Sequence, residues 1–171
     1  MTTNTKKIKP PFRLSLTDAV LIRGFDLIAA ASGLVLLAPI FFLIAAVIKF
    51  TSPGPVFHRA DRIGRRGHLF KLYKFRTMVL DADNKGPGIT LRNDPRLTPL
   101  GGFLRKSKLI ELPQLWNVLM GDMTLVGPRP LPAASLDWYN PKVREIVAES
   151  KPGVTGIASL VFRDEEAFIS Q

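Results

Sequence analysis

Several basic side chains in this sequence are suited to holding phosphate groups. Arg105, Lys106, Lys108 and Arg129 lie between positions 105 and 129, close to two predicted helix starts. Guanidinium groups form paired hydrogen bonds with phosphate oxygens, and helix N-termini also favour anions. A proline on each side of Arg129 restricts the local backbone and so limits where this side chain can point. The pattern predicts phosphate binding, with Arg105, Lys106 and Arg129 as the candidate contacts.

Three carboxylates accompany these cations. Glu111 comes just before a predicted helix, Asp122 follows Gly121, and Asp94 falls in a polar segment. A Mg²⁺ ion that bridges a diphosphate needs only one or two protein carboxylates, because it keeps waters and takes phosphate oxygens. We therefore expect Mg²⁺ as the cofactor, and the spacing alone leaves all three acids open.

Other kinds of site find little support in the sequence. The chain has no cysteine, which excludes a thiolate nucleophile and cysteine-based metal sites. GPGIT at residues 86–90 is too short for a phosphate-binding loop and lacks its Lys-Ser/Thr ending, and no GxSxG motif occurs. His58 and His68 are the only histidines, and without a carboxylate cluster around them we do not expect a metal pair.

An uncharged apolar run lies between Asp26 and Lys49. Leu27 to Ile48 would reach about 33 Å as a straight helix, roughly the thickness of a bilayer core. The run is apolar on every face, which argues against the core helix of a soluble protein. We therefore predict a membrane segment.

Two features of this run favour a re-entrant path over a spanning one. Pro39 lies near its middle and predicts a break, because proline removes a backbone donor and clashes with the preceding turn. Lysines and arginines flank the run on both sides, and such residues favour the cytoplasmic side of a membrane. A helix that dips in, breaks at Pro39 and returns keeps both basic flanks on that side.

The rest of the chain predicts a mixed, mostly helical α/β domain. We divide the chain into a basic tail with an amphipathic surface helix (1–24), the re-entrant segment (25–50) and a cytoplasmic domain (51–171). The predicted elements are a surface helix over 14–23, strands over 56–60 and 69–75, helices over 98–107, 114–120 and 140–149, and a strand over 157–162. Residues 80–96 predict a loop, and 125–132 are too rich in proline for regular structure.

The net charge of +10 predicts anionic partners. With a membrane segment present, lipid headgroups and phosphorylated substrates fit this charge better than nucleic acid, which we do not expect as a partner. The chain ends soon after an acidic triplet at residues 164–166, which leaves open whether the native protein continues past Gln171.

Several motifs in this order resemble one known family. They read SPGPVF, KFRTM, ELPQLWNVL followed by GDM, and LVGPRP, and the matching stretches cover most of residues 25–156. The sequence resembles the bacterial sugar transferases, the monotopic polyprenyl-phosphate phosphoglycosyl transferases. The re-entrant helix broken at proline is also a property of that family, although Ala38 stands where the family often has serine.

The resemblance implies a specific reaction. Such enzymes move a phosphosugar from a UDP-sugar to a polyprenyl phosphate such as undecaprenyl phosphate, release UMP and require Mg²⁺. They act at the cytoplasmic face of the bacterial inner membrane and begin exopolysaccharide, capsule, O-antigen or glycoprotein glycan assembly. The sugar, the nucleotide base, the pathway and the oligomeric state, a homodimer included, stay open.

One position departs from the family pattern. The family has an Asp-Glu pair before the Leu-Pro-Gln triplet, in which the Asp attacks phosphorus and the Glu holds the metal. Glu111 matches the second residue, but Ile110 occupies the first and cannot act as a nucleophile. Three interpretations follow: an impaired member that acts as a scaffold or binding protein, another nucleophile such as Glu111, Asp94 or Asp122, or direct transfer without a covalent step.

Overall fold

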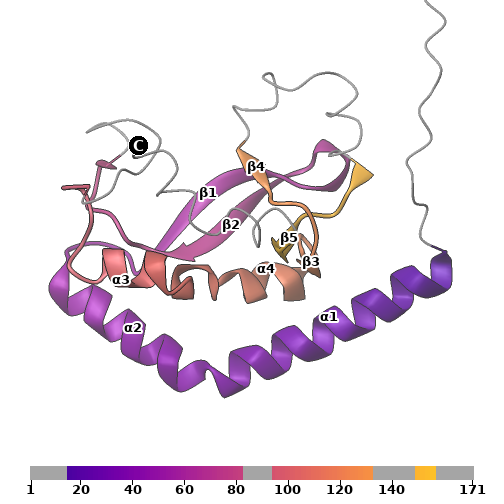
Figure 1. Ribbon diagram of the computed structural model, residues 1–171, viewed down its shortest axis with the longest axis horizontal. Coiled ribbons are helices and arrows are strands. Elements are labelled where there is room, and N and C mark those ends of the chain that lie inside the picture. Colours follow the sequence, from indigo (N-terminus) through magenta and orange to yellow (C-terminus); the bar gives the residue numbers. More distant parts are fainter. Residues whose placement is uncertain (1–14, 83–93, 133–148, 157–171) are drawn as a thin grey trace, which may run out of the picture.

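The computed structural model describes residues 15–82, 94–132 and 149–156. Figure 1 shows these parts in layers, with helices α1 (Leu16–Leu36) and α2 (Ala38–Thr51) along one side of the molecule. Helices α3 (Gly101–Lys106) and α4 (Gln114–Met120) lie next, and a small sheet lies beyond them. The mixed helix and strand class predicted from the sequence is confirmed. The predicted helix at 140–149 lies almost entirely outside the described residues, and the predicted strand at 157–162 lies wholly outside them.

The predicted surface helix and the first half of the apolar run form a single helix, α1. Ser15 caps it, because the Ser15 hydroxyl accepts from the Asp18 amide at 3.1 Å and the Asp18 carboxylate accepts from the Ser15 amide at 3.2 Å. By length and composition, α1 is the one helix in the described part of the chain that could cross a membrane, and little of it is buried.

The apolar run changes direction between α1 and α2. α1 ends at Leu36, and α2 begins at Ala38 with Pro39 in its first turn, where the missing amide of proline is tolerated. Figure 1 shows the two helices meeting as a wide V whose inner side faces the rest of the protein.

The predicted strand pair is present as an antiparallel hairpin. Strand β1 (Phe57–Ile63) is longer than predicted, whereas β2 (Leu69–Phe75) has the predicted bounds, and a short 3-10 turn, η1 (Arg65–Gly67), joins them. The register opposes His58 to Lys74, Ala60 to Leu72 and Arg62 to Phe70. Because cross-strand partners share a face of a sheet, the basic side chains of Arg62 and Lys74 lie on the same face as Phe70 and Leu72.

Two short helices and a 3-10 turn follow the 80–96 region. α4 has the predicted bounds, and Gly121 ends it with a left-handed backbone (φ 95°), as expected for a C-terminal glycine. The helix predicted over 98–107 is shorter than expected: α3 begins at Gly101, with Leu100 at its cap position, and the Thr98 hydroxyl donates to the Thr77 carbonyl at 3.3 Å rather than capping the helix. Between α3 and α4 lies the 3-10 turn η3 (Leu109–Glu111).

The prediction of irregular structure over 125–132 is wrong in part. Strand β3 (Thr124–Val126) pairs in parallel with β5 (Gly153–Thr155), and β4 (Leu131–Pro132) extends the hairpin sheet in the order β2-β1-β4. The proline is tolerated because β4 lies at the sheet edge.

Both apolar helices contribute to the core of the protein. Ala30 of α1 packs with Phe70, Leu72, Val118 and Met123, all at most 6% exposed. A second cluster joins two residues of α2 to the strands and to α3: Ile44, Ile48, Phe75 and Leu104. The opposite faces of α1 and α2 expose large apolar side chains, among them Leu21, Phe25, Ile28, Phe42 and Leu43.

Polar side chains fix α1 to the other layers. The Arg23 guanidinium donates to the carbonyls of Val118 and Leu119 at 2.6 and 2.8 Å, which satisfies the C-terminal end of α4. Asp26, only 2% exposed, accepts from the Thr124 hydroxyl at 2.7 Å and from the Leu125 amide at 3.0 Å. An apolar helix is therefore held in one register against the α/β domain.

Candidate active site

Glu111 lies at the end of η3, in the short connection between α3 and α4. The turn begins after Lys108, which has a left-handed backbone (φ 62°) that is uncommon for a residue with a side chain. The Glu111 amide donates to the Lys108 carbonyl at 3.0 Å and closes the turn. Strained backbone of this kind often accompanies functional positions, because the surrounding fold must hold it.

Two cations face the Glu111 carboxylate. Lys74 Nζ and Arg129 Nη1 each lie 3.9 Å from Glu111 Oε1. The Lys74 and Glu111 side chains are 17% and 23% exposed, whereas Arg129 is 58% exposed. The structure thus brings together two residues predicted from the sequence, Glu111 and Arg129, and adds Lys74 from the end of β2.

The surroundings of Lys74 favour its neutral form. Burial is the main reason that the pKa of Lys74 falls from 10.5 to about 8, and the charges of Arg129, Arg62 and Arg105 lower it further. The Glu111 carboxylate acts in the opposite direction and raises this pKa. Several cations so close to Lys74 form a site of positive potential that suits an anionic ligand.

Arg62 supports the same site from strand β1. Burial, followed by the charge of Arg129, lowers the pKa of Arg62. The Arg62 Nε atom is buried and has no hydrogen-bond partner among the described residues. A buried donor without a partner is costly, so this guanidinium has hydrogen-bonding capacity left for a ligand.

The loop that carries Arg129 is anchored at its base. The Gly153 amide donates to the Pro128 carbonyl at 2.9 Å, and the Gly127 amide donates to the Thr155 carbonyl at 2.9 Å. β5 therefore ties down the start of the Pro128-Arg129-Pro130 segment. Lys106, the third predicted phosphate contact, is exposed in the last turn of α3, and Arg105 reaches the site through its charge.

Ile110 points into an apolar environment. It is partly buried and packs against the cluster formed by Ile44, Ile48, Phe75 and Leu104. At the position where the family resemblance implies a nucleophile, this chain therefore has a side chain that packs with residues of the apolar helix α2, of α3 and of β2.

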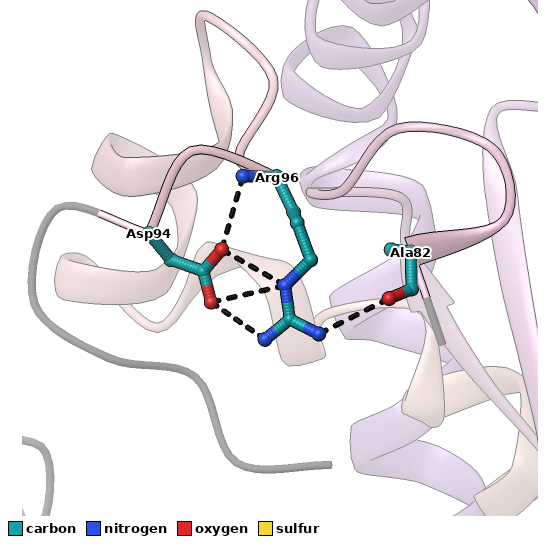
Figure 2. Close-up of polar contacts among 3 residues, drawn as sticks. All are labelled: Ala82, Asp94 and Arg96. Atoms are coloured by element: carbon teal, nitrogen blue, oxygen red, sulfur yellow. Dashed lines mark hydrogen bonds and ion pairs between the residues drawn. The ribbon is translucent and has the colours of Figure 1, made fainter. Parts of the chain in front are cut away.

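The other two candidate acids are engaged elsewhere. Figure 2 shows the buried pair of Asp94 and Arg96, in which Arg96 Nη2 lies 2.7 Å from Asp94 Oδ2 and Arg96 Nε lies 2.9 Å from Asp94 Oδ1. Arg96 Nη1 also donates to the Ala82 carbonyl at 3.1 Å, so one guanidinium links Ala82 to Asp94. Asp122, beyond the far end of α4, accepts from Asn117 Nδ2 at 3.3 Å.

Lys74 and Arg62 are the site residues that the sequence prediction missed. The available signal was a basic residue on the apolar face of each strand, because Lys74 shares its face with Phe70 and Leu72. Arg76, the next basic residue along the chain, has a different role, because it is buried and donates to the carbonyls of Ser52 and Pro53 at the end of α2.

The carboxylates near the site do not form a cage for a metal ion. Within the described residues, no group of three or more His, Asp or Glu side chains comes together. Glu111 alone fits the weaker requirement of Mg²⁺, which takes one or two carboxylates and fills its other positions with water and phosphate oxygens. The two cations at 3.9 Å lie beyond direct hydrogen-bond distance, so the carboxylate oxygens keep lone pairs for such an ion.

Comparison with known proteins identifies the class. The family model described as bacterial sugar transferase matches residues 17–170, and the chain belongs to this family. Membership of this family makes the protein a sugar-phosphate transferase.

Relatives with assigned names agree with this membership. The chain is 41% identical over 150 residues to the exopolysaccharide production protein PSS of Rhizobium leguminosarum bv. phaseoli, covering 84% of this chain and 74% of the relative. It is 43% identical over 140 residues to the UDP-glucose:undecaprenyl-phosphate glucose-1-phosphate transferase of Caulobacter vibrioides, covering 81% and 52%. The Escherichia coli protein of the same name is 40% identical over 149 residues, covering 86% of this chain and 32% of that protein.

Proposed function

We propose that this protein transfers a sugar phosphate from a UDP-sugar to a polyprenyl phosphate such as undecaprenyl phosphate. The product would begin assembly of an exopolysaccharide, capsule, O-antigen or glycoprotein glycan. The observation that carries the proposal is the Glu111 carboxylate, which faces Lys74 and Arg129 and whose neighbour Ile110 packs against the cluster that contains Ile44 and Ile48 of α2. The names of the relatives supply the substrates, and the cationic surroundings of Glu111 suit a diphosphate.

The proposed reaction is a displacement at the phosphorus that carries the sugar. An oxygen of the polyprenyl phosphate attacks this phosphorus, the bond between the two phosphates of the nucleotide breaks, and UMP leaves. Ile110 has no lone pair, and Asp94 and Asp122 are already hydrogen-bonded, to Arg96 and to Asn117. We therefore favour direct transfer, in which Lys74, Arg62, Arg105 and Arg129 hold the diphosphate.

Mg²⁺ belongs to this proposal as the cofactor. Glu111 would hold it, and the bound ion would supply charge neutralisation on the phosphate oxygens. The protein side chains would still provide orientation, because the cations around Glu111 come from β1, β2, α3 and the Pro128–Pro130 segment.

A membrane segment of this kind would bring the site near the lipid substrate. We propose that α1 and α2 enter the bilayer, break at Pro39 and return to the same side, with the domain on the cytoplasmic face of the bacterial inner membrane. The exposed apolar faces of both helices support the insertion, and the basic flanks support the common side.

A second candidate function is a membrane-bound scaffold or substrate-binding protein that has lost catalysis. The packing of Ile110 into the α2 cluster favours it, because an apolar side chain fills the position of the usual nucleophile.

UMP release distinguishes the two candidates. The purified full chain in nanodiscs would be given undecaprenyl phosphate, Mg²⁺ and a panel of UDP-sugars, alongside Glu111→Gln and Ile110→Asp. Asp61→Asn is the matched control, because Asp61 is an exposed acid paired with Lys71 on the outer face of the hairpin. Turnover by the natural chain and by the control, with at least about a hundredfold loss in Glu111→Gln, supports the transferase.

Turnover by Ile110→Asp alone would support the scaffold. Retention of radiolabelled sugar phosphate on the denatured protein tests the mechanism, because a covalent step leaves label on the chain. We expect no retained label on the natural chain, and label on it would contradict direct transfer.

A further inference from the structure

A cavity lies at the opposite end of α4 from Glu111. It has a volume of about 270 Å³. Its walls come from the hairpin turn and the start of β2, from the residues after α4 and from the residue that leads into β5: Gly64, Arg65, His68, Phe70, Gly121, Asp122 and Lys151. The length of α4 separates it from Glu111 by about 10 Å at 1.5 Å per residue. Figure 1 shows these three segments on one side of the molecule, above the N-terminal half of α1.

The cavity contains a cation without a partner in the described part of the chain. Lys151 is half-buried there and has neither a hydrogen bond nor an ion pair with any described residue. Burial is the main cause that lowers the pKa of Lys151; Arg23 and Arg65 lower it as well, whereas Asp26 and Asp122 raise it. A partly buried ammonium group without an ion pair is stabilised by an anion that enters the cavity.

Arg65 and Asp122 define what kind of anion fits. The Arg65 Nε atom donates to the Glu149 carbonyl at 3.1 Å, which orients the guanidinium and leaves its two terminal amino groups without hydrogen bonds to described residues. Asp122 uses one oxygen to accept from Asn117 Nδ2 at 3.3 Å. The cavity therefore offers several donors and one spare carboxylate acceptor, which suits a phosphate with a hydroxyl group nearby.

With α1 inserted in the membrane surface as proposed above, this cavity would lie at the level of lipid headgroups. A Cβ atom built on Gly121 would lie 3.5 Å from Arg23 Nη2, so the base of the cavity adjoins α1. The same half of α1 exposes Leu16, Val20 and Phe25 at 85%, 64% and 66%. Apolar side chains of this kind insert into a bilayer surface and leave polar groups just above them among the headgroups.

We propose that this cavity binds a phosphate ester that carries neighbouring hydroxyl groups, and that the glycerol-phosphate headgroup of an anionic membrane lipid is its source. The phosphate oxygens accept from Lys151 and Arg65, and a headgroup hydroxyl donates to Asp122. Soluble glycerol phosphate offers the same chemistry, and the experiment separates the two sources. The site is independent of the reaction proposed at Glu111.

The test is lipid retention by the full chain in detergent micelles, measured by native mass spectrometry with phosphatidylglycerol and phosphatidylcholine. We expect preferential retention of phosphatidylglycerol, with at least about a tenfold loss in Lys151→Gln and in Arg65→Gln. Arg66→Gln is the matched control, because it removes the same charge one position away, outside the cavity walls. Equal losses in all three variants, or equal retention of both lipids, would overturn the proposal.

Two further measurements keep the result interpretable. Thermal unfolding of each variant shows whether it is folded. If Lys151→Gln does not fold, Arg65→Lys replaces it as the test variant. Competition by soluble sn-glycerol 3-phosphate identifies the source: displacement of the lipid at millimolar concentration indicates a soluble ligand, and no displacement indicates the lipid headgroup. Asp122→Asn should abolish the preference for phosphatidylglycerol over phosphatidic acid, which lacks the hydroxyls, and an unchanged preference would contradict the role of Asp122.

Discussion

Glu111 and Lys74 show how one carboxylate and its neighbours can prepare a site for a diphosphate. Burial lowers the pKa of Lys74 most and three arginines also lower it, whereas the Glu111 carboxylate raises it, so positive charge exceeds negative charge around this ammonium. A diphosphate supplies negative charge and is attracted by all of these cations at once. The affinity of the site for phosphate should therefore depend on the protonation of Lys74.

We predict that the affinity for UDP falls as the pH rises through about 8. The pKa of Lys74 is lowered from 10.5 to about 8, so the ammonium is present below pH 8 and is lost above it, whereas an ordinary lysine stays charged to about pH 10. Isothermal titration calorimetry in EDTA between pH 6.5 and 9.5 measures this without a metal at Glu111. Lys74→Gln should flatten the profile, and Lys71→Gln, the exposed partner of Asp61, should keep it. A natural chain with constant affinity would contradict the assignment.

The position of Ile110 leads to a stability prediction. Ile110→Asp places a carboxylate against the apolar residues Ile44, Ile48 and Leu104, so it should lower the free energy of unfolding by about 1–3 kcal/mol. Ile110→Val, which only shortens the side chain, should cost no more than about 1.5 kcal/mol. Urea unfolding in detergent measures both, and an Asp variant as stable as the natural chain would show that residue 110 faces the site.

At the scale of elements, local signals predicted some parts well and tertiary contacts decided the rest. β2 and α4 have their predicted bounds because strand alternation and the left-handed Gly121 are encoded within each segment. β3 and β5 are only three residues each, and their pairing joins Thr124 to Gly153 across the chain, which no local pattern reveals. Threonine is a common helix-capping residue, yet the Thr98 hydroxyl donates a hydrogen bond to the Thr77 carbonyl and does not cap α3.

The same distinction applies to the candidate site. Arg129 was predicted from its setting between two prolines, and Glu111 was singled out from three candidate acids by the family resemblance. Lys74 and Arg62 join them only because the hairpin register and the packing of η3 bring these residues together. The burial of Ile110 likewise depends on α2, which is more than 50 residues earlier in the chain.

The docking of α1 onto α4 depends on one guanidinium. Arg23→Gln leaves the Val118 and Leu119 carbonyls with at most one donor, and it should lower the free energy of unfolding by about 1.5–3 kcal/mol. Arg23→Lys keeps the charge but not the paired geometry, so its cost should be intermediate. Chemical unfolding in detergent checks the order, and equal stability of all three chains would contradict the docking role.

The end of α2 offers a second test with an internal control. Gly54 has φ 110°, and a Cβ atom there would collide with Nη1 of the buried Arg76, so Gly54→Ala should lower the free energy of unfolding by about 1–3 kcal/mol. Gly102 in α3 has open space around it, and Gly102→Ala should raise the same free energy by up to about 1 kcal/mol. Thermal unfolding of the two variants should therefore shift in opposite directions, and shifts of the same sign would refute the argument.

At the scale of the whole molecule, the apolar V of α1 and α2 has two different faces. Its inner face forms part of both core clusters and carries Asp26, which is bonded to β3, so the helices cannot leave the domain without breaking the core. Its outer face exposes large apolar side chains, which is compatible with membrane association. In the re-entrant insertion proposed above, the depth of the V in the bilayer would set the depth of the domain, and Glu111, whose neighbour Ile110 packs against the α2 cluster, would share that depth.

This arrangement makes the path of the chain through the bilayer testable. The chain has no cysteine, so single cysteines can be introduced at Thr17, at the start of α1, and at Asp61, in the hairpin beyond α2, without background labelling. A re-entrant path leaves both on the cytoplasmic side, and a spanning path puts them on opposite sides. In intact cells we expect a membrane-impermeant maleimide to label neither position, and in inverted vesicles to label both. A cysteine at Leu37, where the two helices meet, should resist labelling in both preparations because it would lie within the lipid. Labelling of Thr17→Cys from outside intact cells would establish a spanning helix, and the site around Glu111 would then have one basic flank on its own side instead of two.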